Sequence, residues 1–251
     1  MVKKNIINLN NVSLDIPIVS KRDQTIKKSF LKAVTGGRLS FKKNKTSIRA
    51  LNSININIKS GEKIALIGHN GSGKTSFIKL ISGIYKETSG KIIRNVEVYP
   101  MLQKSFLVSD YLTGIDSAKA HYLLLNNNLK NFSQYLDDIV SFSGLGDFIS
   151  LPLRTYSEGM ASRLMFSMLT YHSHACLALD EGLGTGDSSF YEKAERRLDQ
   201  FIKKSGTLIL ASHSDSLLRR FCKRGLVFSK GTVVYDGKLE EALTYYDKNR
   251  N

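Results

Sequence analysis

The sequence predicts an α/β fold with a mostly parallel core sheet and an inserted helical subdomain. Short apolar runs that are typical of buried strands alternate with helical patterns, which indicates β-α units. A glycine-rich turn joins one of these runs to a helix, and the stretch from about 110 to 170 reads as mostly helical. The 251 residues, of which 41% are hydrophobic and 24% charged, suffice for one domain with a substantial core and exclude collagen-like and disordered classes.

The N-terminal part of the chain predicts extended structure on both sides of a basic arm. Residues 6–18 read as an extended segment with Pro17 at its end, and isoleucines that alternate with polar residues predict a half-buried strand over 53–59. The stretch 19–49 between them is polar and basic and contains glycine, so it is interpreted as an arm or insertion.

Four short apolar runs are the candidates for buried core strands. They cover residues 63–67, 175–179, 207–211 and 226–228. The first run is followed by the glycine-rich turn and by a helix with apolar residues over 77–81. Ligands of such folds bind where the carboxyl ends of the strands meet, so the residues directly after these runs are the candidates for a site.

Positive charge is concentrated in the first 60 residues. They hold 13 of the 37 Lys and Arg residues but only 2 of the 22 Asp and Glu residues, in a chain whose formal net charge is +15. Such a patch attracts nucleic acid, anionic lipid headgroups or phosphate-bearing substrates, and its sign does not distinguish these from a merely solvated face.

A phosphate-binding loop is predicted directly after the first core strand. The segment matches G-x-x-x-x-G-K-[ST] and stands between a strand and a helix, as that pattern requires. Its residues are Gly68, His69, Asn70, Gly71, Ser72, Gly73, Lys74 and Thr75, followed by Ser76. The glycines let backbone N–H groups face a triphosphate together with the helix N-terminus, Lys74 adds charge, and Thr75 offers its hydroxyl to Mg²⁺. The loop therefore predicts binding of a nucleoside triphosphate with Mg²⁺.

Two carboxylates and a histidine are predicted to complete this site. Asp180 and Glu181 follow the run at 175–179; Asp180 is expected to bind Mg²⁺ through water, and Glu181 to act as the catalytic base on the attacking water. His213 follows the run at 207–211, so it is expected at the carboxyl edge of the sheet. There its imidazole would hydrogen-bond the γ-phosphate and the attacking water, which makes it the second catalytic candidate.

The segment Tyr156-Ser157-Glu158-Gly159-Met160, which opens a helix before the strand of Asp180, resembles a family signature. It is similar to the L-S-G-G-Q of ATP-binding-cassette (ABC) ATPase subunits. Ser157 and Gly159 match that signature, whereas the other three residues depart from it. The resemblance implies that the chain, 1–251, is a single ABC ATPase domain that binds ATP and has an antiparallel β subdomain beside its core sheet. It also implies that Ser157, Gly159 and their helix N-terminus bind the γ-phosphate of ATP held by a second copy.

Further segments resemble the ATPase subunits of bacterial polysaccharide exporters, which move O-antigen, capsule or teichoic-acid polymers. They are the runs NVSLDIP at 11–17, GHNG at 68–71, LTG at 112–114 and LDEGLGTGD at 179–187. This branch has a similar D-E-x-x-x-x-G-D run, which implies that Asp187 is the carboxylate that faces the partner subunit. Some relatives carry a carbohydrate-binding domain after the cassette, and because this chain ends at Asn251 we expect none here.

Two features of the family are assigned as candidates. Gln103, which follows a strand-like segment, is the candidate for the glutamine that contacts Mg²⁺ and couples the site to the membrane subunit. No aromatic residue stands clearly where the family stacks adenine, so Phe41, Ile48 and Arg49 remain open alternatives.

The resemblance implies the ATP-hydrolysing subunit of an exporter that moves a lipid-linked polysaccharide across the inner membrane. Its implied partners are a second copy of itself and an integral membrane permease, which delivers the lipid-linked glycan. The start of the chain lacks the apolar core of a signal peptide, and Cys176 and Cys222 fit neither a disulfide framework nor a metal site. We therefore expect a peripheral protein on the cytoplasmic face of that membrane, with the 19–49 arm near the membrane surface or the diphosphate of the glycan carrier.

Two alternative functions share the core motifs. One is the ATPase subunit of another ABC importer or exporter, which differs only in the branch-specific segments. The other is a soluble ABC ATPase that acts on nucleic acid or ribosomes. The basic charge suits it, but such proteins usually carry two cassettes or long coiled coils, and this chain has one P-loop and no heptads. No nucleic-acid partner is expected.

Overall fold

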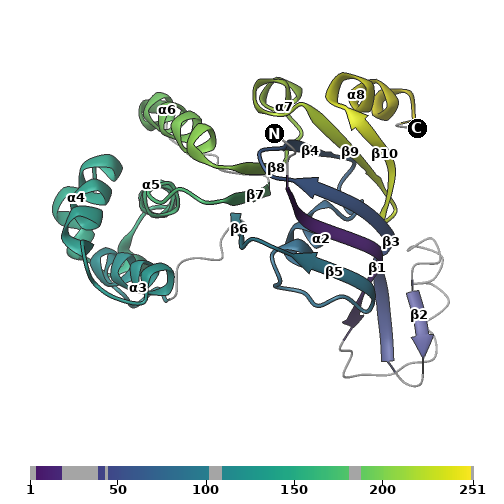
Figure 1. The fold of residues 1–251 in the computed structure, drawn as a ribbon. Helices are drawn as coiled ribbons and strands as arrows, with labels where there is room; N and C mark the ends of the chain where they lie inside the picture. The colour runs from purple at the N-terminus through teal and green to yellow at the C-terminus, as the bar shows by residue number, and fades with distance from the viewer. Residues whose placement is uncertain (1–3, 19–38, 43–44, 102–108, 181–187, 250–251) are drawn as a thin grey trace. The chain divides into compact units, whose positions relative to one another are not determined.

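The computed structural model describes residues 4–18, 39–42, 45–101, 109–180 and 188–249. The chain divides into two compact units, each built from segments that are far apart in the sequence (Figure 1). The first contains Met1–Pro100, Ala175–Asp180 and Gly206–Asn251, and the second contains Met101–His174 and Glu181–Ser205.

The first unit contains an antiparallel sheet of four strands in the order β2-β3-β1-β5 (Figure 1). Its strands are β1 (Asn5–Ile18), β2 (Leu39–Lys42), β3 (Lys45–Lys59) and β5 (Ser89–Arg94). Ile7 of β1 pairs with Ile58 of β3, and Leu9 pairs with Ile56, so the alternating apolar residues of both strands share one buried face. β3 begins well before the expected start at 53, because residues 45–52 pair with the second half of β1 and with β2 although they lack alternation.

The core sheet has six strands in the order β10-β9-β4-β8-β7-β6. They are β4 (Lys63–Ile67), β6 (Val98–Met101), β7 (Cys176–Asp180), β8 (Thr207–Ala211), β9 (Arg224–Ser229) and β10 (Thr232–Lys238). β4 runs parallel to β8 and β9, β7 runs parallel to β8, and β10 is antiparallel to β9. The α/β fold with a mostly parallel core sheet and a separate antiparallel sheet is thus confirmed. The carboxyl ends of β4, β8 and β7 meet at one edge of the core sheet.

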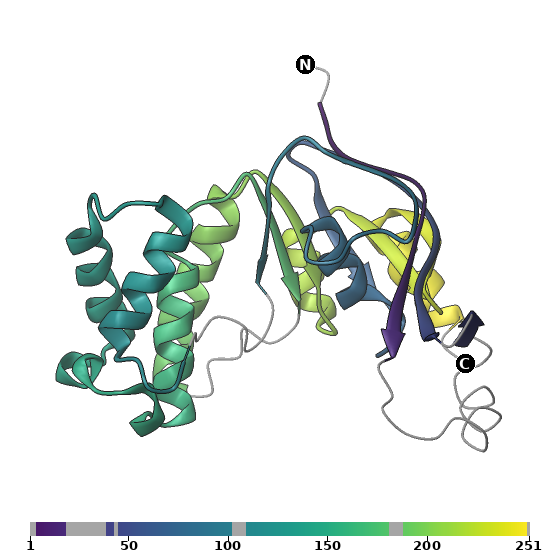
Figure 2. The ribbon, with the colours of Figure 1, turned by 90° about the horizontal axis from the view of Figure 1, so that it is seen from below.

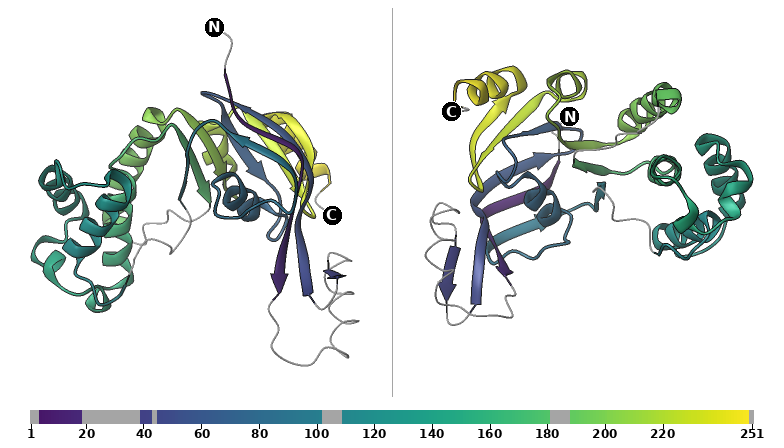
Figure 3. Two further views of the ribbon diagram at one scale, coloured as in Figure 1. Left: turned by 60° about the horizontal axis from the view of Figure 1, so that its bottom comes forward. Right: turned by 180° about the vertical axis from the view of Figure 1, so that it is seen from behind.

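Among the described residues, the first unit contains the helices α2 (Lys74–Ile81), α7 (Asp215–Phe221) and α8 (Leu239–Lys248). α2 buries the apolar residues of 77–81, and the ring of Phe77 lies 5.2 Å from that of Phe228 in β9. Burial of each such side chain stabilises the fold by roughly 1.5–3 kcal/mol, which fixes the start of α2 beside the sheet. α8 packs on β9 and β10, the yellow elements of Figure 3.

The second unit is helical, and Figure 2 shows it as the teal and green bundle. Its elements are α3 (Gly114–Asn126), α4 (Phe132–Ser143), the 3-10 turns η1 (Gly146–Ser150) and η2 (Leu153–Thr155), α5 (Glu158–Leu169) and α6 (Ser188–Lys204). An apolar core with Tyr135 and Ile139 of α4 and Leu164 of α5 at its centre holds α3, α4 and α5 together. This unit contains the stretch from 110 to 170 that was expected to be helical, and α6 in addition. No helix of the described ranges is long and apolar enough to cross a membrane.

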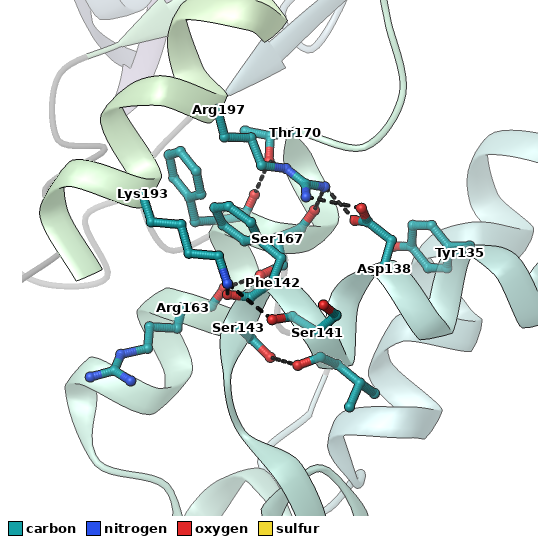
Figure 4. Close-up of polar contacts among 12 residues, drawn as sticks. Tyr135, Asp138, Ser141, Phe142, Ser143, Arg163, Ser167, Thr170, Lys193 and Arg197 are labelled. Carbon is teal, nitrogen blue, oxygen red and sulfur yellow. Dashed lines mark hydrogen bonds and ion pairs between the residues drawn. The ribbon is translucent and has the colours of Figure 1, made fainter. Parts of the chain in front are cut away.

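Two cations on α6 bind it to α4 and α5 (Figure 4). Arg197 donates hydrogen bonds of 3.1 and 2.5 Å to the carboxylate of Asp138 in α4 and one of 2.8 Å to the hydroxyl of Thr170, just after α5. Lys193 donates to two carbonyls at the end of α4, both at 3.0 Å, where the helix dipole favours positive charge. Both cations also lie over the ring of Phe142, so α6 is attached by charge as well as by apolar packing.

Candidate functional site

The glycines of the predicted phosphate-binding loop are required by the geometry of the turn between β4 and α2. Gly68, Gly71 and Gly73 have φ values of 149°, 77° and 118°, which side-chain-bearing residues rarely adopt. A Cβ on Gly68 would lie 2.5 Å from the carbonyl oxygen of Phe228, and one on Gly73 would lie 3.1 Å from that of Ala50. The loop therefore curls tightly against the neighbouring backbone, as a phosphate cradle does.

Lys74 and the start of α2 provide the positive side of this loop. The ammonium of Lys74 donates to the carbonyl oxygens of Gly68 at 2.5 Å and His69 at 3.2 Å, and only 7% of this residue is exposed. The N-cap Gly73 makes no side-chain cap, and the first turn of α2 contains no acidic residue, so the amides of that turn can bind an anion. Within the described part of the chain, the buried hydroxyl of Ser72 has no hydrogen-bond partner. These features fit a ligand rich in phosphate oxygens.

Asp180 and His213 lie at the same edge of the core sheet as the loop. Asp180 ends β7 and pairs in parallel register with Ala211, the last residue of β8, and His213 follows two residues later. The Nε2 of His213 lies 3.0 Å from the Oδ1 of Asn70 in the loop. An amide oxygen only accepts hydrogen bonds, so Nε2 carries the proton in this pair. Asn70 thus holds the imidazole at the loop, and half-buried Asp180 stands on the adjacent strand.

The signature residues lie in the second unit, at the start of α5. Ser157 is the N-cap of this helix, and its Oγ accepts a hydrogen bond of 3.2 Å from the backbone N–H of Met160. The side chain of Ser157 is exposed, and a Cβ on Gly159 would meet nothing closer than the Oγ of Ser157 at 3.9 Å. The described structure thus gathers the loop, Asp180 and His213 in one unit and places the signature in the other.

Three predicted site residues, Gln103, Glu181 and Asp187, lie outside the described residues, as does most of the 19–49 arm. Their roles remain predictions. The adenine-stacking residue also stays open, because the side chain of Phe41 is not described. Arg49 donates to the carboxylate of Asp15 at 2.7 and 2.9 Å, which ties it to the antiparallel sheet.

Two contacts of the site residues were not foreseen in the sequence. Asn70 and His213 were each singled out, but their hydrogen bond joins residues 143 positions apart and depends on the strand order. The hydroxyl of Tyr156, which departs from the signature, donates to the carbonyl oxygen of Phe148 at 2.8 Å. No sequence pattern marks either pair: the first joins residues that follow different strands, and the second joins residues eight positions apart, one in the turn η1 and one just after η2.

The chain is similar to known proteins in sequence and in fold. The profile of the family described as ABC transporter matches residues 51–184. The O-antigen export system ATP-binding protein RfbE of Yersinia enterocolitica is 35% identical over 231 residues, which cover 92% of this chain and 96% of that protein. The teichoic acids export ATP-binding protein TagH of Lactococcus lactis is 30% identical over 246 residues, which cover 96% of this chain and 52% of that protein. A solved dimeric ATP-binding cassette bound to ADP and phosphate has a TM-score of 0.66 at 19% identity, covering 93% of this chain and 99% of that one.

Proposed function

This chain belongs to the ABC transporter family and is the ATP-hydrolysing subunit of a transporter, and we propose that this transporter is a bacterial exporter of lipid-linked polysaccharide. The cargo would be of the O-antigen, capsule or teichoic acid type, moved across the inner membrane. The names of the two export relatives support this cargo class, as do the segments LTG at 112–114 and LDEGLGTGD at 179–187. The likeness extends over more than nine-tenths of this chain in both relatives.

The observation that supports the chemistry is the shared edge of the core sheet, where the phosphate loop, Asp180 and His213 lie together. The amides at the start of α2 and the ammonium of Lys74 would hold the β- and γ-phosphates. His213, whose Nε2 hydrogen-bonds Asn70 in the described structure, would exchange this bond for one to a γ-phosphate oxygen when ATP is bound. Glu181, the residue after Asp180, would accept a proton from the attacking water.

Oxygen donors at this edge fit Mg²⁺, which prefers hydroxyl, carboxylate and amide oxygens together with water and phosphate. The exposed Thr75 in the first turn of α2 and the half-buried Asp180 at the end of β7 are two such donors, and Gln103 is the predicted third. When bound, Mg²⁺ neutralises charge on the phosphate oxygens.

The site would be completed by a second copy of the chain. Ser157 accepts the N–H of Met160, so its own O–H remains to donate outward from an exposed helix N-terminus. Such a donor suits the γ-phosphate bound to the other copy, and Asp187 would face that copy across the pair. The likeness in fold to a dimeric cassette supports this arrangement.

Transport requires a partner that spans the bilayer, and we propose an integral permease that presents the lipid-linked glycan. The chain would then be peripheral on the cytoplasmic face of the membrane. The basic 19–49 arm would lie near the anionic surface or the carrier diphosphate, because clustered Lys and Arg residues are attracted to both.

The hydrolytic part of the proposal is tested with two purified variants. Glu181→Gln is expected to bind ATP with parental affinity, to form an ATP-bound dimer on gel filtration, and to release phosphate at least about 100-fold more slowly, as loss of a general base does. Lys74→Ala is expected to lose ATP binding, whereas Lys79→Ala on the same helix is the control that keeps it. Parental phosphate release by Glu181→Gln would exclude the base, and unchanged ATP affinity in Lys74→Ala would exclude the loop.

The cargo is tested in cells with and without the gene for this chain. Lipid-linked glycans are extracted from the cytoplasmic and surface fractions, and the deletion is expected to leave a polymer inside and missing from the surface. Complementation with Lys74→Ala serves as the control and should not restore export. Unchanged surface glycan without any accumulation would contradict polysaccharide export and leave the ATPase subunit of another transporter.

A further inference from the structure

Two motifs that the proposed function leaves unexplained, LTG at 112–114 and the tyrosine at the head of the signature, meet in the second unit. We propose that Tyr156 is a positioning residue for the signature Ser157, and that Gly114 is glycine because it must leave room for the Tyr156 hydroxyl and the Ile149 carbonyl. Tyr156 stands where the family signature has leucine, and its hydroxyl lies beside Gly114 of the LTG motif, so the two motifs form one structural pair.

The contacts of Tyr156 fix the residue at both ends of its side chain. Its ring packs against the apolar core of the helical unit, and its hydroxyl donates to the carbonyl oxygen of Phe148 at 2.8 Å. Desolvation raises the pKa of this hydroxyl above its ordinary value of 10, so the group is protonated and donates at neutral pH. Because Ser157 follows directly, the direction of its side chain depends on how the backbone of Tyr156 is held.

The LTG motif has glycine at position 114 because there is no room for a Cβ, and not because of the backbone conformation. It is the first residue of α3, where its φ lies outside the left-handed range, so any residue could adopt its conformation. A Cβ there would lie 2.5 Å from the hydroxyl oxygen of Tyr156 and 2.8 Å from the carbonyl oxygen of Ile149. An alanine would therefore displace the tyrosine, the η1 backbone or both.

Backbone hydrogen bonds also join the segment before α3 to the segment before the signature. The N–H of Leu153 donates to the carbonyl of Leu112, and that of Arg154 to the carbonyl of Asp110, both at 2.9 Å. Thr113 forms a bridge with Pro152 and caps α3 by accepting the N–H of Asp116 at 3.0 Å. The residues that lead into Ser157 are thus attached to those that lead into α3.

This inference rests on the proposed contact of Ser157 with ATP on a second copy, and its test separates the two. Steady-state hydrolysis is measured for Ser157→Ala, Tyr156→Phe and their combination, together with ATP affinity and the thermal transition. Tyr156→Phe is expected to lower kcat about 10-fold, since a displacement of about 1 Å can cost up to about 100-fold, while ATP affinity and folding stay near parental. In the Ser157→Ala background it should have no further effect, because Tyr156 acts through Ser157.

Two further variants exclude a general loss of structure. Gly114→Ala is expected to lower kcat as well. The loss in Gly114→Ala combined with Tyr156→Phe should be smaller than the product of the single losses, because the methyl then meets only the Ile149 carbonyl and no longer the hydroxyl. Tyr111→Phe, at a tyrosine that is 77% exposed in the same unit, is the control and should leave kcat unchanged.

The outcomes distinguish the inference from the function on which it rests. If Ser157→Ala leaves hydrolysis unchanged, the signature assignment fails and the inference fails with it. If Ser157→Ala impairs hydrolysis but Tyr156→Phe does not, or if the two losses multiply, Tyr156 does not position Ser157 and only the inference is overturned.

Discussion

Acidification is expected to destabilise the helical unit through a buried histidine cluster. His121 of α3 is 4% exposed, and its Nδ1 lies 2.7 Å from the hydroxyl of Tyr135. Burial, aided by the neighbouring His172 and His174, lowers the pKa of His121 to about 4. Burial likewise lowers the pKa of His174 to about 4. Both imidazoles are therefore neutral in the folded chain throughout the range where free histidine takes up a proton.

The magnitude follows from the difference between the folded and unfolded pKa values. As pH falls below about 6.5, His121 binds a proton in the unfolded chain but stays neutral in the folded chain, so the free energy of unfolding decreases. The decrease is about 1.4 kcal/mol per pH unit for a fully shifted histidine, or about 3 kcal/mol for His121 between pH of about 6.5 and 4. The contribution of His174, whose pKa is also lowered to about 4, has the same sign.

Urea unfolding followed by far-ultraviolet circular dichroism at pH 7.5, 6.5, 5.5 and 4.5 measures this slope. His121→Gln keeps a polar partner for Tyr135 but does not titrate, so its stability should fall less steeply below pH 6.5 than that of the parental chain. His69→Gln, at an exposed histidine, is the control and should keep the parental slope. Equal slopes for the parental chain and His121→Gln would refute the assignment of the acid sensitivity to this histidine.

Two further substitutions test contacts described above. Asp138→Ala removes the carboxylate that binds Arg197, whose side chain is 15% exposed. It should lower the free energy of unfolding by about 2 kcal/mol, a value between those for exposed and buried ion pairs. Asp137→Ala, at an exposed residue, is the control in the same denaturation assay, and equal stability of the two variants would count against the ion pair. Gly68→Ala places a Cβ 2.5 Å from the Phe228 carbonyl and should abolish ATP binding in a calorimetric titration. Gly61→Ala, with φ of 76° but open space, should keep ATP affinity; retained binding in Gly68→Ala would contradict the loop geometry.

The core strands could be predicted because their signal is local. β4 and β8 have the expected bounds 63–67 and 207–211, since strands covered on both faces read as uninterrupted apolar runs. β3 was predicted only over 53–59, where one face is buried, and its first half is held by pairing with β1. That pairing has no local signature, because it joins residues about 30 positions apart whose alternation is broken by register shifts.

The site shows the same division between local and tertiary information. The curled turn before α2 was predictable because glycine positions, Lys74 and the following helix form one contiguous pattern, whereas its binding of phosphate stays a prediction. The hydrogen bond between Asn70 and His213 forms because β4 and β8 are neighbours in the sheet, and other strand orders would separate these two strands. The attachment of α6 by Arg197 also escaped prediction, because a basic residue on a polar helix more often faces solvent.

The N-termini of α2 and α5, which both belong to the proposed site, are expected to differ in their affinity for anions. At α2 the N-cap is Gly73, no side chain occupies the first-turn amides, and no carboxylate stands nearby in the turn. At α5 the N-cap Ser157 already binds one amide, and Glu158 adds a negative charge that opposes an anion. α2 can therefore hold a phosphate without help, whereas α5 offers chiefly the outward O–H of Ser157. In the proposed pair, such a signature would gain affinity only when ATP that is bound at the other copy's loop is brought to it. Weak binding at α5 would then make hydrolysis depend on pairing of the two copies, and in the proposed exporter it would link each hydrolysis event to their closure.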